Sequence, residues 1–311
     1  MTLRRLTDGV HWLSHCEADG ERHLHLSEYL LDGGDGYVLV DSGSTRFRDD
    51  IVAEVNAVTD GAGPDVVVLA HQVLPHKENL PAFEAEWGDL EVVTAVPRLG
   101  GLDLIADVPG FTDIIGVSGA RGTVLGRPRD LAGRTITCTR PLLTDVTVSQ
   151  WLFDHDARLL VTAEAFGHYH APGDCLKTSA DLDGGVDQRH VTRFYRDKLT
   201  FLDQLDLGKV RAALEALLDR LDPRYIAPIH GTPVAGEDAD AYVDLVEAIA
   251  ERDVDACVSV KSSQIGLDIG DDVFEENLAR IVAAANDSGA AGADGPGTFV
   301  WIDMEDHETT D

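Results

Sequence analysis

The stretch DVVVLAHQVLPHKENLP, residues 65–81, constrains the fold more than any other part of the sequence. Residues 66–70 form a short, continuous apolar run rich in β-branched side chains, which predicts a fully buried strand. The run ends in a loop that carries His71 and His76, and residues 77–87 can form a helix. A strand that ends in histidines just before a helix is typical of α/β proteins, which present side chains at the carboxyl edge of a sheet.

Strands and helices alternate on both sides of this stretch. We expect strands at residues 10–14, 24–31, 37–41, 66–70, 91–95, 122–125, 134–139, 146–153, 158–162 and 225–228, with a turn at 127–130. We expect helices at residues 47–58, 77–87, 188–204, 207–221 and 239–251. Residues 97–119 show no clear pattern.

The pattern changes after residue 252. Strands at residues 257–260 and 298–303, with a helix at 272–285 between them, predict a small β-α-β extension. We therefore expect a domain of residues 1–252 and an acidic C-terminal extension of residues 253–311. The order of the elements predicts an α/β (α+β) fold.

The formal net charge of −31, from 56 acidic and 25 basic residues, is spread along the whole sequence. Such a dispersed excess indicates a surface adapted to high salt, because in molar salt the Debye length is only about 3 Å and self-repulsion is screened. We therefore expect a halophilic, cytoplasmic protein. The same charge disfavours nucleic acids and anionic membranes as partners. No apolar run approaches the roughly 18 residues of a membrane-spanning helix, and the N-terminus lacks the apolar core of a signal peptide.

The cysteines and the N-terminal histidines do not suggest a site by themselves. The four cysteines are far apart in the sequence and form no C-x-x-C motif, which predicts isolated, reduced thiols: Cys16, Cys138, Cys175 and Cys257. His23 and His25 alternate along an expected strand, so they share one face. Because no carboxylate framework lies nearby in the sequence, we expect both on the surface.

Five strand ends deliver side chains that can bind a metal ion. They are Asp41, the pair His71 and His76, Asp145 after Thr144, Glu164, and His230. Each has an ordinary structural alternative, such as a turn for Asp41, a loop cap for Glu164 or a loop position for His230. As a set they indicate a functional site at one edge of a sheet.

Six segments resemble the metallo-β-lactamase superfamily and, within it, the lactamase-like domain of the flavodiiron proteins: EYLLDGGDGYVLVDSGS, VVVLAHQVLPHKENLPAF, LAGRTITC, LLVTAEAFGHYH, VTRFYRDKL and YIAPIHGTPV. Together they span roughly residues 10–235. The resemblance implies an αββα sandwich, here with a small C-terminal appendage, and a metal site at its open edge.

The resemblance also shows which ligands are missing. Flavodiiron proteins have the loop His-x-Glu-x-Asp-His, whereas this chain has HQVLPH at residues 71–76. Val73 and Pro75 occupy the two inner positions, and neither side chain can coordinate an ion. The implied ligands that survive are His71, His76, Glu164 and His230.

The remaining positions of the implied site are altered. The bridging aspartate of the family corresponds to Glu164, which is one methylene longer. The middle histidine of the family falls near Thr144, where Asp145 is the only nearby candidate. The resemblance therefore implies a single Fe or Zn ion held by His76, His230 and Glu164, an arrangement of two imidazoles and a carboxylate.

The other half of the implied site keeps His71, with Asp145 and Glu164 beside it. Four further residues are candidate accessory ligands: Asp145, Glu78, His168 and His170. For His168 and His170 the alternative is a solvent-exposed loop.

Three functional interpretations follow. The first is a flavodiiron-like protein with a reduced, mononuclear metal site and hydrolase- or oxygen-related chemistry. The second is a catalytically silent scaffold, sensor or partner subunit that has lost the metal, and the third is an active metallohydrolase. Residues 253–311 are too few for a flavodoxin domain, so we expect no FMN on this chain. We expect a homo-oligomer, with a separate redox protein as a partner.

Overall fold

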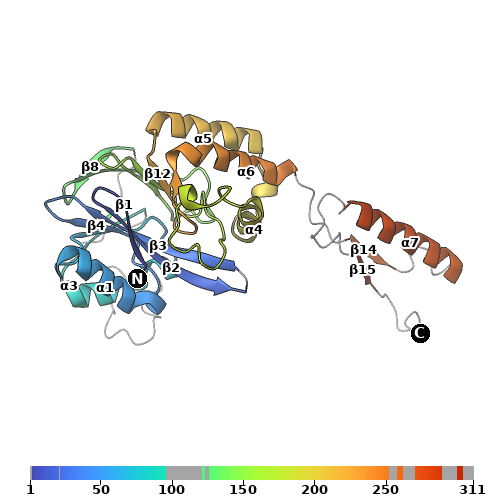
Figure 1. Ribbon diagram of the computed structural model, residues 1–311, viewed down its shortest axis with the longest axis horizontal. Coiled ribbons are helices and arrows are strands. Elements are labelled where there is room, and N and C mark those ends of the chain that lie inside the picture. The colour runs from blue at the N-terminus through green and yellow to red at the C-terminus, as the bar shows by residue number, and fades with distance from the viewer. Residues whose placement is uncertain are drawn as a thin grey trace. The chain divides into compact units, whose positions relative to one another are not determined.

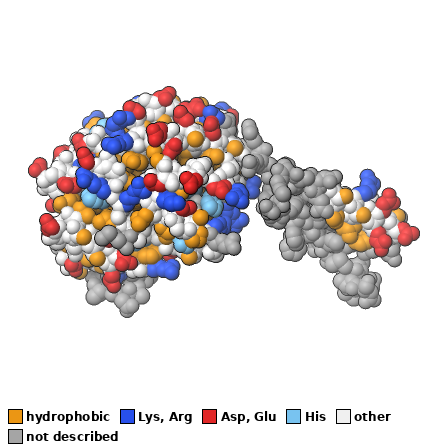
Figure 2. Space-filling model, in the orientation of Figure 1, with side chains coloured by type: hydrophobic (Ala, Val, Ile, Leu, Met, Phe, Trp, Pro, Cys, Tyr) orange, Lys and Arg blue, Asp and Glu red, His pale blue; other side chains and the backbone are white. Residues whose placement is uncertain are grey.

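The computed structural model describes residues 2–20, 22–95, 121–122, 126–251, 258–261, 270–288 and 300–303. The chain forms two compact units, Met1–Ala250 and Glu251–Asp311. Across the ranges that the structure describes, every helix is too short or too polar to cross a lipid bilayer. In the space-filling view, acidic side chains are spread over the visible face of the first unit and do not gather in one patch (Figure 2).

The first unit contains two β-sheets packed face to face, with helices on both outer faces (Figure 1). Within the described residues the first sheet has seven strands in sequence order: β1 (Leu3–Thr7), β2 (Val10–Asp19), β3 (Arg22–Asp32), β4 (Tyr37–Val40), β5 (Val66–Val68), β6 (Glu91–Thr94) and β7 (Arg121–Gly122). The pairings from β1 to β4 are antiparallel, and those from β4 to β7 are parallel.

The second sheet has six strands among the described residues. Their order is β13 (Val234–Ala235), β12 (Tyr225–Ala227), β11 (Leu159–Val161), β10 (Trp151–Asp154), β9 (Arg134–Thr139) and β8 (Pro128–Leu131). Only β11 and β12 pair in parallel here, with Leu159 opposite Tyr225 and Val161 opposite Ala227. Their carboxyl ends therefore meet at the same edge of the sheet.

Alternation along the central strands explains the layers. In β4, Val38 and Val40 enter the core between the two sheets, whereas Leu39 packs on the outer face. Residues 66–68 of β5 repeat this alternation. Strands that are buried on both faces read as continuous apolar runs, and this is what the sequence shows at β5.

Helices complete the sandwich on both sides. Helices α1 (Arg48–Thr59) and α3 (Leu80–Trp87) cover the first sheet, where Ile51 and Phe83 pack against Leu39 and its neighbours. The second sheet is covered by α4 (Gln188–Lys198), α5 (Leu207–Leu221) and α6 (Ala239–Glu251), which pack in one core with Trp151 and Phe153. The layer order is αββα, as predicted.

The second unit is described by itself. In it, β14 (Val258–Lys261) and β15 (Val300–Asp303) pair in parallel, with Val258 opposite Val300. Helix α7 (Asp271–Ser288) lies between them in sequence. Cys257 and residues 298–299 lie outside the described part.

Several expected elements differ in the structure. β1 was not predicted, and residues 128–131 form the edge strand β8 where we expected a turn; an edge strand tolerates Pro128 because only one of its sides is paired. The expected helix at 77–87 is two helices, α2 (Leu74–Lys77) and α3. The expected helix at 188–204 ends with α4 at Lys198. Residues 97–119 and 123–125 lie outside the described part.

Candidate metal centre

A cavity of about 230 Å³ lies beyond the carboxyl ends of three strands. His71 follows β5, Glu164 follows β11 and His230 follows β12. Parallel pairing of β11 and β12 places the last two segments side by side. The polar side chains that line the cavity include His71, His76, Asp145, Glu164, Lys198 and His230. The predicted ligands from distant parts of the sequence therefore share one cavity.

His71, Asp145 and Glu164 form the compact group of this cavity. Their potential ligand atoms all lie within 4.8 Å of one another. His71 Nε2 lies 2.6 Å from Glu164 Oε1 and 3.9 Å from Asp145 Oδ1. His71 and Glu164 are buried, whereas the Asp145 side chain is partly exposed.

Two neighbours fix the position of His71. Its Nδ1 lies 2.7 Å from Ser149 Oγ, so both ring nitrogens have a polar partner. The buried Asp41 carboxylate accepts hydrogen bonds from the backbone N–H groups of Ala70 and His71, at 2.9 and 3.2 Å. Asp41 thus holds the loop that carries His71 and does not itself line the cavity. Burial is the main reason why the pKa of Asp41 lies well above its usual range.

His76 and His230 lie on the other side of the cavity. The His76 ring is 5.0 Å from the ring of His71 and 5.0 Å from that of His230, centroid to centroid. His230 Nδ1 donates to the carbonyl of His25 at 2.7 Å, which leaves Nε2 as the nitrogen able to bind an ion. Burial lowers the pKa of His76 well below its usual range and that of His230 to about 3. Both imidazoles are therefore neutral at pH 7, the form that binds metals.

The backbone around Glu164 is strained. Ala163 and Phe166 have φ angles of 51° and 64°, in the left-handed region that non-glycine residues rarely adopt. Such strain costs free energy and persists where the surrounding structure enforces it, most often at functional sites. Here it turns the chain after β11 so that the Glu164 side chain reaches the cavity.

The donor set has the chemistry of a metal-binding site. Glu164 Oε2 and His76 Nδ1 are buried atoms without a hydrogen-bond partner, so each has a lone pair or a proton to satisfy. Imidazoles and carboxylates suit Zn and Fe, with metal–ligand bonds of about 2.0–2.2 Å. The 2.6 Å contact between His71 and Glu164 is a hydrogen bond, however, and two ligands of one tetrahedral ion would lie about 3.4 Å apart. This pair would have to separate slightly around an ion.

Three of the candidate accessory ligands do not line the cavity. Glu78 Oε2 accepts hydrogen bonds from Ser44 Oγ, at 2.9 Å, and from the N–H of Thr45, at 2.8 Å. His168 uses both ring nitrogens, since Nδ1 donates to the Phe166 carbonyl and Nε2 accepts from the N–H of Thr232. His170 lies in another group of residues, described below. Asp145 is therefore the accessory candidate that the structure places at the cavity.

Several residues that we expected on the surface are buried in the structure. His168 and His170 are 1% and 3% exposed, so the exposed-loop alternative is wrong for both. His25 is fully buried, which contradicts its expected place on the surface. Cys16 and Cys175 belong to one compact group with His23 and His170, so the expectation of isolated thiols is wrong for these two.

The sequence matches no family model and no curated protein. The structure, in contrast, is similar to solved structures of flavodiiron proteins. Rubredoxin oxygen:oxidoreductase from Desulfovibrio gigas has a TM-score of 0.69 and 16% identity, over 97% of this chain and 71% of that chain. The flavodiiron protein from Giardia intestinalis has a TM-score of 0.67 and 13% identity, over 98% and 70%. A 1–254 fragment of a diflavin flavoprotein from Nostoc sp. PCC 7120 has a TM-score of 0.59 and 18% identity, over 79% and 95%.

The fold is that of the lactamase-like domain of flavodiiron proteins. At these identities the similarity shows the fold alone, so the chemistry has to be argued from the cavity. Within this flavodiiron fold, Val73 and Pro75 line the cavity beside His71 and His76. Two apolar side chains thus face the space where an ion would lie.

Lys198 is one of the polar cavity residues that sequence reasoning missed, together with Glu17 and Ser44. It is the last residue of α4, and its charge adds to burial in lowering the pKa of His76 and His230. The segment VTRFYRDKL contributes to the resemblance and lysine is scarce in this chain, but neither signal shows which helix face points to the cavity. Ser149 was missed for a similar reason, since only the bridge between His71 and Ser149 brings it close.

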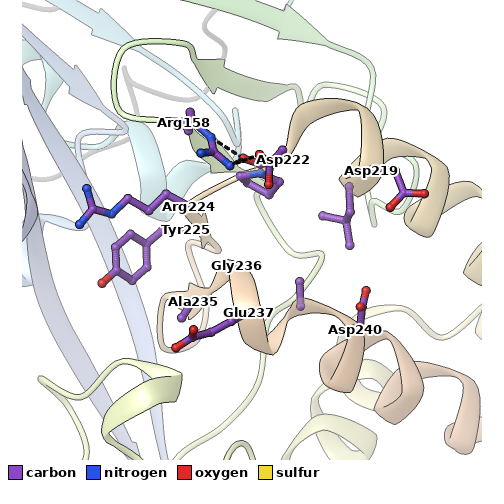
Figure 3. Close-up of a pocket in the computed structure, with 12 residues that line it drawn as sticks. Arg158, Asp219, Asp222, Arg224, Tyr225, Ala235, Gly236, Glu237 and Asp240 are labelled. Atoms are coloured by element: carbon purple, nitrogen blue, oxygen red, sulfur yellow. Dashed lines mark hydrogen bonds and ion pairs between the residues drawn. The ribbon is translucent and has the colours of Figure 1, made fainter.

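A second hollow, of about 640 Å³, lies on the surface where β12 meets α5 and α6 (Figure 3). Its lining includes Arg158, paired with Asp222, and the acidic residues Asp219, Glu237 and Asp240. None of the predicted metal ligands lines it. The larger hollow is thus separate from the candidate metal centre.

Proposed function

We propose that this chain binds one Fe²⁺ or Zn²⁺ ion in the cavity and is a metal-dependent protein with hydrolytic or oxygen-related chemistry. The observation that carries the proposal is the group of His71, Asp145 and Glu164, whose potential ligand atoms lie within 4.8 Å of one another. His76 and His230 add neutral donors around the same cavity. The solved flavodiiron structures are of proteins whose name states two irons, and this supports iron as one of the two candidate ions.

A single ion is favoured over two because of the apolar lining. Val73 and Pro75 line the cavity. At the two corresponding positions, the His-x-Glu-x-Asp-His loop of flavodiiron proteins has carboxylates. Removing two carboxylates removes negative charge that a second cation needs. The remaining donors are enough for one ion with an open position, which is the arrangement of catalytic sites.

The residues of this chain divide the remaining tasks. When bound, the ion would supply Lewis acidity and lower the pKa of a bound water molecule. Asp145, a partly exposed carboxyl beside Glu164, would add a third oxygen or nitrogen donor to the ion with His71 and Glu164. Lys198 offers a positive charge to an anionic group of a ligand. Asp41 and Ser149 keep His71 in place.

Metal analysis of the full chain, purified in molar salt without chelator, tests the proposal. We expect the Glu164→Gln variant to contain one ion fewer than the natural chain, because the amide cannot supply a charged ligand. Glu78→Gln is the matched control, since its carboxylate lies outside the cavity and the metal content should not change. Equal metal content in all three proteins would contradict the proposal.

A second candidate function is a catalytically silent scaffold or sensor. The 2.6 Å contact between His71 Nε2 and Glu164 Oε1 favours it, because it gives these two atoms a polar partner without an ion. Hydrolysis of activated esters and oxygen consumption with a chemical reductant separate the two candidates. We expect turnover that depends on Glu164 in the first case and none in the second. Oxygen reduction consumes electrons, and we propose that a separate redox protein supplies them to this chain, which we expect to act as a homo-oligomer.

A further inference from the structure

A second group of potential metal ligands lies outside the cavity. It consists of Cys16, His23, His170 and Cys175, which we call the Cys/His cluster. One potential ligand atom from each residue lies within 4.8 Å of those of the other three. In the described part of the chain, this cluster and the His71 group are the two sets of three or more such residues that are this compact.

Strand pairing explains how the cluster forms. Cys16 on β2 pairs with His25 on β3, and Ala18 pairs with His23, so Cys16 and His23 share one face of the hairpin. His170 pairs with His23 from the loop that follows β11: each backbone N–H donates to the carbonyl of the other residue, at 2.8 and 3.0 Å. The loop thus extends this edge of the sheet and brings its own side chains to the hairpin.

Cys175 is held in place through its backbone. Its carbonyl accepts a hydrogen bond from His25 Nε2 at 2.9 Å and another from Ser14 Oγ. His25 in turn stacks on the ring of His170, with centroids 3.9 Å apart and planes 18° apart. The donors of the cluster are therefore positioned by buried neighbours, as the ligands of natural metal sites are.

The distances within the cluster match a tetrahedral metal site. Bonds of about 2.3 Å to sulfur and 2.0–2.1 Å to nitrogen put a sulfur and a nitrogen ligand of one ion about 3.5 Å apart. Three of the four sulfur–nitrogen pairs here lie 3.5 Å (Cys16 and His170), 3.3 Å (His23 and Cys175) and 3.4 Å (His170 and Cys175) apart. His170 Nε2 lies close to both sulfurs, but a single N–H or lone pair can form a good hydrogen bond with only one of them. An ion at the centre serves all four residues.

The electrostatics agree with this geometry. Burial lowers the pKa of His170 to about 4, which keeps its imidazole neutral at pH 7. Burial, together with the neighbouring Cys175, raises the pKa of the Cys16 thiol. Ionising two adjacent, half-buried thiols costs free energy, because the negative charges repel each other and are poorly solvated. A bound cation offsets this cost.

We propose that the Cys/His cluster binds one zinc ion in a closed Cys₂His₂ site. Four protein ligands leave no open position, which is the mark of a structural site, and thiolates select zinc over magnesium, calcium or manganese. The ion ties the loop after β11 to the β2–β3 hairpin. That loop also carries His168, whose N–H donates to the carbonyl of His230 at 2.9 Å, so the zinc anchors a segment that backs the cavity.

Cobalt substitution tests this site separately from the cavity. The full chain is stripped of metal in molar salt under reducing conditions and titrated with Co²⁺. We expect a thiolate-to-cobalt charge-transfer band that reaches its maximum by two equivalents of Co²⁺, one for the Cys/His cluster and one for the cavity. The cavity contains no cysteine, so the charge-transfer band reports the Cys/His cluster alone. His71→Ala should leave this band unchanged, whatever it does to the metal in the cavity.

Three variants complete the test. Cys175→Ser should lose the band, whereas Cys138→Ala, which removes a buried cysteine outside the cluster, should keep it. His23→Gln changes a half-buried residue, so it serves if Cys175→Ser does not fold; it should weaken Co²⁺ binding by at least tenfold. A missing band in the natural chain, an equal band in Cys175→Ser, or a Cys16–Cys175 disulfide in the protein as purified would overturn the proposal.

Discussion

The two groups of potential ligands in the first unit differ in their spacing and in their surroundings, and this difference underlies the two roles that we propose for them. The His71 group lies at the ends of parallel strands, borders a cavity and contains a hydrogen bond of 2.6 Å that an ion would have to open. The Cys/His cluster has sulfur–nitrogen distances of 3.3–3.5 Å that already suit an ion. Donors that are already spaced for an ion and leave no open position favour stability, whereas donors beside a cavity that must move apart around an ion favour exchange of ligands.

The largest effect should come from emptying the Cys/His cluster. We expect the double variant Cys16→Ser/Cys175→Ser to lose about 4 kcal/mol of unfolding free energy, the stabilisation given by a ligand present at 1,000 times its Kd. Denaturant unfolding in molar salt, with and without chelator, measures this. Cys138→Ala should lose only about 1 kcal/mol and should keep its sensitivity to chelator. A double variant as stable as the natural chain would remove the contrast between the two groups.

Replacing a cavity ligand should change metal content more than stability. We expect His230→Ala to lose the cavity ion while the cobalt–thiolate band of the Cys/His cluster stays. The free energy of unfolding should fall by about 2 kcal/mol, the typical cost of truncating a buried side chain. Metal analysis and denaturant unfolding on the same preparation give both values. Loss of the thiolate band in this variant would show that the two groups are one coupled site.

Adding carboxylates to the cavity tests the difference between the two groups by gain of a ligand instead of loss. We expect the double variant Val73→Glu/Pro75→Asp to raise the metal content of the cavity from one ion to two, because it returns the two ligand types that divalent cations need. Metal analysis of the Cys16→Ser/Cys175→Ser background isolates the cavity. Unchanged content would mean that the spacing of His71, His76 and His230 also has to change.

A pH series tests one buried histidine, His168, that belongs to neither group of potential ligands. Burial lowers the pKa of His168 to about 3, whereas the unfolded value is 6.5, so the unfolded state binds the proton more readily. Stability should therefore be complete above pH 6.5 and should fall, by up to about 1.4 kcal/mol per pH unit, as the pH drops towards 3. Protonation would place a second N–H of His168 against the N–H of Thr232.

The variant His168→Gln tests the origin of this slope. It should unfold with a shallower pH dependence between pH 6.5 and 4, measured by denaturant titration, and with the same dependence as the natural chain between pH 7 and 9. An unchanged slope at acid pH would assign the effect to other groups.

The smallest effect should come from Glu78. Its carboxylate accepts hydrogen bonds from the residues that open the turn before α1, so Glu78→Gln should cost about 1 kcal/mol of unfolding free energy. Thermal unfolding measures this cost. A loss of metal in this variant would place Glu78 in the cavity after all.

The cavity could be predicted from the sequence because its potential ligands directly follow residues that are recognisable as strands. The apolar run before His71 shows a strand buried on both faces, and the carboxyl ends of parallel strands meet at one edge. The strands before Glu164 and His230 could be predicted in the same way. The partner of His71 was not, since the contact with Ser149 depends on how a loop folds back across the sheet edge.

The Cys/His cluster could not be predicted from spacing. Cys16 and His23 share a hairpin face, which strand register can show once the hairpin is known. His170 and Cys175 come from a loop more distant in sequence, and the bridge between His23 and His170 and the hydrogen bonds of Cys175 bring the two segments together. No local motif reports a pairing between an edge of one sheet and a loop that follows a strand of the other.

The parallel pairing of β11 with β12 also sets an order of assembly. Parallel strands need a long crossover, and here the chain between them contains α4 and α5, so the pair closes late and at a high entropic cost. Glu164 and His230 meet only after this step, whereas Cys16 and His23 meet as soon as a local hairpin forms. We therefore expect the cavity to be completed late in folding, after the strands that carry its donors have paired.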